Sequence, residues 1–418
     1  MRKFFTFLSF FCLAVQAWST DYTNGFFILN EEQYGVQPSC LNFYSYEDET
    51  VHLRVFQEAN PGLNLGETCE FAQIFNGNIY FCSKQNHGAG GRFIVADAKT
   101  LKVKYNIADY PSGGDSRAFC GVNATKGYIG TTVGIYVFDI EQMQVTSIIE
   151  GTTSDNGAYS GQVGDMVCDG NYVFAAKQGT GVLVINAETD EIENTISISD
   201  IATVFEADGK IYAAVNSASW SVPSESDNEK FVEINSEGIV KETTVPMSCS
   251  ATWGAWQPSK PAVKGSSLYY NAASLINYLS RYDLSTDTFT QKFVNFTNGY
   301  QMYAPCVALE PKTGELIAVT FKGYSNTNYN INFINAESGD ITKTIPMNGR
   351  YWFSSMILFP EDSSIPTPVE RLETERHAIT STYYNLNGTQ SNTPFSGFNT
   401  IVTTYSDGSR TSTKKIYR

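Results

Sequence analysis

Histidine is the side chain that most often moves protons near neutral pH, and this chain of 418 residues contains only three. His52 lies in a strand-like run and His377 in a linker-like stretch, which leaves His87 in the glycine-rich loop Asn86–Arg92. A single loop histidine is more often a solvated surface group than a catalyst. The chain also lacks GxSxG and HExxH sequences, the motifs of serine hydrolases and zinc proteases. These residues favour binding over catalysis, with His87 as a candidate ligand contact.

Aromatic side chains are the more informative candidates, because concave aromatic surfaces hold flat or ring-shaped ligands such as sugars and corrins. Every tryptophan after the first twenty residues falls in a loop and not in a regular strand. The predicted ligand-binding residues are His87, Trp220, Trp253, Trp256, Tyr300, Tyr303, Arg350 and Trp352. Tyr34, Tyr159 and Tyr324 are further candidates in neighbouring loops of this kind, and Asp115, Arg117 and Asp155 are candidate polar partners. The alternative is that the tryptophans only pack between neighbouring structural units.

Seven cysteines remain after a leader that contains Cys12, and an odd number without CxxC spacing predicts no disulfide framework. Four of them recur in the strand before a turn glycine, which predicts small buried packing residues: Cys69, Cys120, Cys168 and Cys306. With so few histidines to converge on an ion, we predict neither a metal site nor a cofactor.

The elements that must position these loops repeat along the chain. Glycines open apolar strands at intervals of 39 to 56 residues, namely Gly25, Gly77, Gly127, Gly170, Gly209, Gly265 and Gly314. A second apolar strand follows each of them and mostly ends at Asp or Asn, as in Phe93–Asp97 and Val182–Asn186. The interval is about the length of one four-stranded propeller blade. Because a blade buries its faces only against neighbours, the repeats predict an all-β, seven-bladed β-propeller over residues 20–362.

The ends of the repeat region predict how the ring closes. After the leader-like residues, only the short segment Asp21–Asn24 leads into the first turn glycine, so the first blade lacks its inner strand. The last apolar run, Phe353–Pro360, has no blade after it and should complete the first one. A ring of six or eight blades is the alternative. In either ring the tryptophan-bearing loops emerge on one face, around the mouth of the channel.

Charge excludes one class of partner. The formal net charge is −15, and the whole acidic excess lies in the repeat region, because the leader and the tail are both net basic. Such a surface repels phosphate backbones, so nucleic-acid binding is not expected.

The two ends of the chain resemble targeting sequences. Residues 1–19 combine Arg2-Lys3, a short apolar run and Ala17-Trp18-Ser19, which is typical of a cleaved secretory signal. Bulky residues before Cys12 disfavour the alternative of lipidation. Residues 363–379 form a polar, proline-containing linker, and 380–418 predict a small β-sandwich-like tail.

The repeats and the tail also resemble known families. The run Gly25–Glu31, with Leu41–Tyr44 and Gly66–Thr68, resembles the opening of the YncE-like surface propellers of Bacteroidetes, many of them domains of unknown function. One branch of that group binds cobalamin beside an outer-membrane transporter. The elements Tyr383–Gly388, Pro394–Gly397 and the basic end resemble the C-terminal sorting domain of type IX secretion substrates. That resemblance implies recognition by the secretion machinery; an accessory domain packed on the ring is the alternative.

Together these features predict a secreted, cell-surface propeller that binds a glycan, a cofactor or a protein through its aromatic loop face, without catalysis. The first alternative is a corrinoid-capturing accessory protein of an outer-membrane transporter, which the resemblance implies. The second is a propeller-fold polysaccharide lyase or hydrolase. The third is a protein–protein scaffold at the cell surface.

Overall fold

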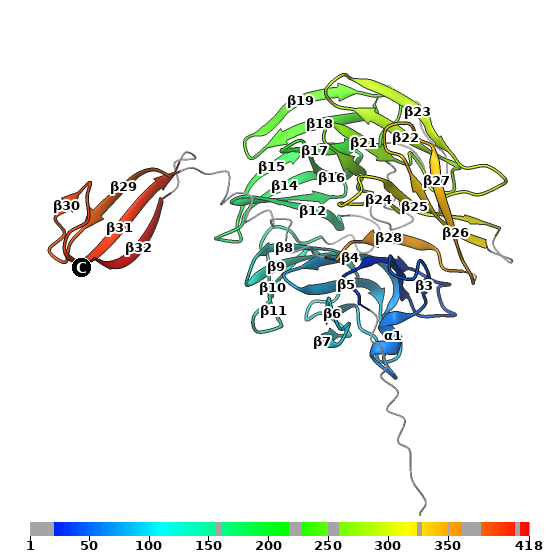
Figure 1. The fold of residues 1–418 in the computed structure, drawn as a ribbon, viewed down its shortest axis with the longest axis horizontal. Coiled ribbons are helices and arrows are strands. Elements are labelled where there is room, and N and C mark those ends of the chain that lie inside the picture. The colour runs from blue at the N-terminus through cyan, green and yellow to red at the C-terminus, as the bar shows by residue number, and fades with distance from the viewer. Residues whose placement is uncertain are drawn as a thin grey trace, which may run out of the picture.

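The computed structural model describes residues 21–154, 161–216, 228–249, 259–323, 328–349, 351–360, 378–405 and 410–417. Within these ranges, residues 25–358 form seven four-stranded antiparallel sheets, and residues 378–417 form an eighth. Figure 1 shows the seven sheets arranged as a ring. The architecture is the β-propeller that the repeats predict.

In six of the seven ring sheets, four strands that follow one another along the chain lie side by side. The first sheet has the same arrangement but takes its first strand from the end of the repeat region, residues 354–358. Neighbouring sheets contact each other mainly through their first strands, which therefore surround the axis. The first four sheets are β28 (Ser354–Leu358), β1 (Gly25–Asn30), β2 (Cys40–Ser45), β3 (Val51–His52); β4 (Glu67–Phe75), β5 (Asn78–Gln85), β6 (Phe93–Asp97), β7 (Val103–Ile107); β8 (Ser116–Asn123), β9 (Lys126–Thr131), β10 (Ile135–Asp139), β11 (Gln144–Ile148); and β12 (Val163–Asp169), β13 (Tyr172–Lys177), β14 (Gly181–Asn186), β15 (Ile192–Ser197). The other three are β16 (Ile201–Ala207), β17 (Lys210–Val215), β18 (Lys230–Asn235), β19 (Gly238–Thr244); β20 (Ala262–Lys264), β21 (Ser267–Tyr270), β22 (Tyr278–Asp283), β23 (Thr288–Asn295); and β24 (Val307–Leu309), β25 (Leu316–Lys322), β26 (Asn328–Ile334), β27 (Ile341–Met347).

The core lies between the faces of neighbouring sheets. The central strands are almost wholly buried, whereas outer strands such as β7 and β11 alternate between half-buried and exposed residues. Tyr80 of the second sheet stacks on Phe119 of the third, with ring centroids 4.0 Å apart. Cys69, Cys120 and Cys306 are buried in these cores, which fits their predicted role as packing residues.

The ring closes between the two ends of the repeat region. β28 pairs antiparallel with β1, with Ile28 opposite Ile357, so the last propeller strand completes the first sheet as predicted. In Figure 1 this orange strand runs beside the blue strands of the N-terminal region. The aromatic rings of Phe26 and Phe333 then meet across the seam at 6.1 Å.

Acidic or amide side chains make the predicted turns after the third strand of most sheets. Asn186 Oδ1, for example, accepts backbone hydrogen bonds from Glu188 at 2.8 Å and Thr189 at 3.1 Å. This local bond reverses the chain before the outer strand. The same bond to a following backbone amide is made by Asp97, Asp139, Asn235, Asp283 and Asn335.

Two of the seven repeat glycines do not have the predicted turn conformation. Gly77, Gly170, Gly209, Gly265 and Gly314 have positive φ, but Gly25 and Gly127 do not. At Gly25 a Cβ atom would lie 2.0 Å from the carbonyl oxygen of Tyr44, and at Gly127 it would lie 2.4 Å from the Phe119 ring. Close packing therefore requires glycine at these two positions.

The tail differs in detail from its prediction. The strands β29 (Ala378–Tyr384), β30 (Gln390–Ser391), β31 (Gly397–Tyr405) and β32 (Arg410–Tyr417) form one sheet in the order β30-β29-β31-β32. The described residues thus form a single layer where a sandwich-like tail was predicted, and the first strand begins before residue 380. The one described helix is short, α1 (Val55–Ala59), and none of the described helices is long and apolar enough to cross a membrane.

Candidate ligand-binding site

Half of the predicted site residues can be placed. His87, Tyr300, Tyr303 and Trp352 lie in described loops, all at the end of the ring where β1 and β5 finish and β4 and β28 begin. The predicted contacts Trp220, Trp253, Trp256 and Arg350 lie outside the described residues, as do Asp155, Tyr159 and Tyr324. We therefore build the site from the loops on either side of the seam.

A pocket of about 400 Å³ lies where the ring closes. Its volume falls in the range of about 300–1,000 Å³ that is usual for small-molecule sites. We call it the junction pocket, and it is lined by Gln33, Val36 and Gln37 after β1, by Arg54 after β3, and by Gly349, Tyr351 and Trp352 between β27 and β28.

Trp352 forms part of the wall but offers little free surface. Its side chain is only 4% exposed and packs with the core of the seam, and its Nε1 donates to the carbonyl of Asn348 at 3.3 Å. The Arg54 guanidinium covers its ring at 5.2 Å from the centroid. Trp352 is thus mainly a packing residue. Half-buried Tyr351 and exposed Val36 supply the open apolar surface of the pocket, whereas the candidate Tyr34 is exposed in the same loop as Val36 and does not line the pocket.

Arg54 is the charged group among the described residues that line the pocket, and a buried carboxylate holds it. Its Nη2 donates to Glu32 Oε1 at 2.7 Å. The Glu32 side chain is fully buried, and this burial raises the pKa of its carboxyl to about 7 against the opposing effects of the Cys40 thiol and Arg54. Among the described residues, no other acceptor takes a hydrogen bond from the Arg54 guanidinium. Stacking and one ion pair therefore orient a cation whose other N–H donors can meet a ligand.

The backbone around the pocket is strained. Four residues there that are not glycine have left-handed conformations, with φ of 65° at Glu32, 56° at Arg54, 63° at Tyr351 and 45° at Phe353. Each such residue costs roughly 1–2 kcal/mol. Two backbone hydrogen bonds oppose that cost by joining the walls, from Glu31 N to Phe353 O at 3.1 Å and from Glu32 N to Trp352 O at 3.0 Å. Strain of this kind gathers at functional sites, so it supports the pocket as a candidate.

Glu31, which precedes Glu32 in the sequence, belongs to a second polar group. We call this group the channel cluster, and it consists of Glu31, Glu70, Lys84 and Tyr303. Lys84 Nζ lies 2.7 Å from Glu70 Oε2, and Tyr303 donates its hydroxyl to Glu31 Oε2 at 2.8 Å. Burial raises the pKa of both carboxyls and lowers the pKa of Lys84. The predicted residue Tyr303 therefore holds a buried carboxylate, while Tyr300 packs beside the sixth sheet with Lys322 Nζ 6.0 Å from its ring.

A β-bulge recurs in the first strand of several sheets at the same end of the ring. The pairing register shifts at Glu70, Arg117, Ala202 and Ser355, and across Gly164-Asp165 in β12. Each bulge inserts an extra residue, which re-aims a side chain beside the axis. Sequence alternation gave no signal for Glu70 or Asp165, because a bulge breaks the period on which such reading depends.

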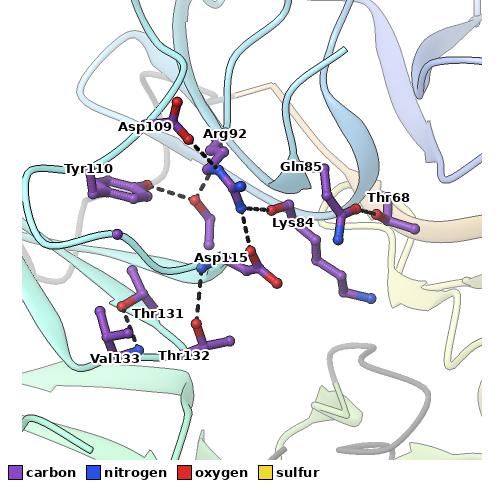
Figure 2. A network of polar contacts seen from close by, with 12 residues as sticks. Thr68, Lys84, Gln85, Arg92, Asp109, Tyr110, Asp115, Thr131, Thr132 and Val133 are labelled. Atoms are coloured by element: carbon purple, nitrogen blue, oxygen red, sulfur yellow. Dashed lines mark hydrogen bonds and ion pairs between the residues drawn. The ribbon is translucent and has the colours of Figure 1, made fainter. Parts of the chain in front are cut away.

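The polar candidates Asp115 and Arg117 belong to a network of ion pairs and hydrogen bonds within the protein. Figure 2 shows Arg92 bonded to Asp109, to Asp115 and to the backbone carbonyl of Lys84. Arg117 Nη2 lies 3.8 Å from Asp115 Oδ2, and its Nε donates to Gln162. These groups join the second, third and fourth sheets beside the channel.

His87 lies beside the junction pocket and does not line it. Its Nδ1 is 2.6 Å from Glu67 Oε1, and Glu67 Oε2 accepts a hydrogen bond from Gly35 N at 3.4 Å. Gly35 belongs to the loop 33–37 that forms one wall. His87 is therefore a positioning residue for that wall. Sequence reasoning missed Glu32 and the pocket-lining residues Gln33, Val36, Gln37, Arg54, Gly349 and Tyr351.

Comparisons with known proteins agree with the fold. A family model described as a domain of unknown function (DUF5074) matches residues 24–360. A quinonprotein alcohol dehydrogenase-like protein from Bacteroides thetaiotaomicron is 18% identical, with 81% of this chain and 79% of that chain covered and a TM-score of 0.61. A protein from Bacteroides fragilis named for a 6-phosphogluconolactonase activity is 12% identical, with 82% and 100% covered and a TM-score of 0.52. No curated protein matches. At these identities the solved structures show a shared fold alone.

Proposed function

Since the chain belongs to that family of unknown function, we propose that it is a secreted, cell-surface propeller that binds a ligand in the junction pocket without catalysis. The observation that carries this proposal is the Arg54 guanidinium. It is stacked on Trp352 and paired with buried Glu32, yet it keeps N–H donors toward a pocket of ligand size.

The proposed location rests on the two ends of the sequence. The signal-like residues 1–19 support export, and the resemblance of residues 380–418 to type IX sorting domains supports recognition by the secretion machinery. Deleting 380–418 should leave the protein inside the cell envelope, where antibodies applied to whole cells do not reach it. Surface labelling equal to that of the full chain would contradict this part of the proposal.

The binding role can be tested on the full chain after leader removal. Purified saccharides and cobalamin are titrated calorimetrically into the protein and into Arg54→Gln and Tyr351→Ala. We expect each substitution to weaken the ligand that binds by about tenfold, because each removes a pocket contact. Lys210→Gln, at an exposed ion pair with Glu233, is the matched control. Unchanged affinity in both pocket variants would contradict the site.

The same titrations separate the alternatives. Tight binding of cobalamin would favour the corrinoid-capture role beside an outer-membrane transporter. Steady release of cleaved product from a polysaccharide would favour the lyase or hydrolase. Binding of a protein, with no response to any small molecule, would favour the scaffold.

A further inference from the structure

We infer that the ligand of the junction pocket is an acidic saccharide, held through the carboxylate of a uronic acid residue. This inference rests on the proposed binding function and names its ligand class. It follows from the donors of the pocket, from its two amides and from the charge around Arg54.

The guanidinium provides a fixed, planar fork. Of the described residues, only Glu32 accepts hydrogen bonds from its side chain, through Nη2. The group lies over the Trp352 ring, with its Cζ 5.2 Å from the ring centroid. Two parallel N–H bonds from such a fork match the two oxygens of a carboxylate.

The rest of the lining suits a sugar better than a peptide. Among the described residues, neither the Gln33 nor the Gln37 side-chain amide has a hydrogen-bond partner, and each offers both a donor and acceptors. Sugar hydroxyls likewise donate and accept. Tyr351 and Val36 add apolar surface for the C–H face of a sugar ring. A peptide that binds by strand addition would need an open strand edge with free backbone groups, whereas loops line this pocket.

Charge adds a pH dependence to the binding. The chain has a net charge of −15, so an acidic ligand depends on local cations. Arg54 faces Glu32, and among the charged or titratable groups of the described residues only Arg54 and the Cys40 thiol hydrogen-bond to Glu32. Glu32 takes up a proton below about pH 7, which leaves the guanidinium charge to the ligand. Above that pH two carboxylates share one cation. Acidic saccharides should therefore bind more tightly in mild acid.

The test compares the binding of acidic saccharides with that of the same saccharides after their carboxyl groups have been reduced to neutral alcohols. Tetrasaccharides of galacturonate, glucuronate and mannuronate are titrated into the full chain at about pH 5.5 and about pH 8, together with their carboxyl-reduced counterparts. At the lower pH we expect at least one acid to bind about tenfold tighter than its reduced form. Arg54→Gln should remove this preference, and Arg54→Lys should remove most of it, because lysine keeps the charge and loses the fork. Glu32→Gln should keep the preference and lose its pH dependence.

Each outcome decides one of the two claims. If every acid binds no tighter than its reduced form, or none binds, the inference is overturned. If a neutral saccharide binds instead and Tyr351→Ala weakens it, the proposed function stands without the inference. If a saccharide binds with equal affinity to the unsubstituted protein, to Arg54→Gln and to Tyr351→Ala, the proposed site is wrong. Thermal unfolding of each variant verifies that it is folded.

Discussion

Glu31 and Glu32 are neighbours in the sequence, but their carboxylates belong to two regions of different character. Glu31 points into the channel cluster, where Tyr303 donates to it and Lys84 and Glu70 lie close by. Glu32 points the other way and holds Arg54 against Trp352 at the edge of the junction pocket. The left-handed backbone at Glu32 accompanies this change of direction.

We interpret the channel cluster as structural and the junction pocket as the proposed binding site. In the channel cluster the ionic groups are buried and pair with one another, so the polar atoms serve the protein. In the junction pocket the cation is partly exposed and uses only part of its donor capacity within the described residues. Substitution in the first region should therefore change stability, and substitution in the second should change affinity.

The largest effect is expected in the channel cluster. Lys84→Met leaves the buried Glu70 carboxylate without its cation, which should lower the free energy of unfolding by about 3 kcal/mol in urea titrations. The double variant Lys84→Met/Glu70→Leu should recover at least half of that loss. Lys210→Met breaks an exposed pair and should cost less than about 1 kcal/mol. If Lys84→Met and Lys210→Met lowered the free energy of unfolding equally, the buried Lys84–Glu70 pair would contribute no more to stability than the exposed Lys210–Glu233 pair.

A substitution at Gly349 should affect both stability and binding. Its φ is 126°, and a Cβ atom there would lie 2.4 Å from Cζ2 of Trp352. Gly349→Ala should therefore cost about 2 kcal/mol and shift the surface on which Arg54 stacks, with loss of binding. Gly209→Ala, which has φ of 69° and open space around it, should cost about 1 kcal/mol and leave binding intact. If Gly349→Ala bound ligand with unchanged affinity, the Trp352 surface would not contribute to the binding site.

Glu32 should make stability depend on pH. The folded-state pKa is about 7 against an ordinary value of 4.5, so the folded protein binds the proton more tightly. Its burial therefore costs little below about pH 4.5, and the cost grows to at most about 3 kcal/mol above pH 7. Glu32→Gln removes this cost. Its free energy of unfolding, relative to the unsubstituted protein, should rise from acid to pH 8, and a constant difference would contradict the assignment.

The smallest effect is expected at His87. Its pair with Glu67 is partly exposed, so His87→Ala should cost less than about 1 kcal/mol and weaken binding less than about threefold through the loop 33–37. Asn86→Ala in the same loop is the control. A loss as large as that of Arg54→Gln would make His87 a direct ligand contact.

The fold could be predicted from the sequence because each repeat gives the same local signals. The turns at Asp97 and Asn186 can be predicted from neighbouring residues alone. The same holds for the last propeller strand, which the sequence shows as an apolar run with no blade after it. The junction pocket could not, because it forms only when residues more than 300 positions apart close the ring. Nothing in the local sequence distinguishes Arg54 from any other arginine, and its role depends on Trp352 arriving from the far end of the propeller.

The most direct test is the affinity of one acidic tetrasaccharide for three proteins at about pH 5.5, measured by calorimetry: the full chain, Arg54→Gln and Lys84→Gln. The account predicts that Arg54→Gln binds at least about tenfold more weakly, whereas Lys84→Gln loses stability and keeps its affinity within about threefold. Equal affinity of the full chain and Arg54→Gln would contradict the claim that the junction pocket is the binding site.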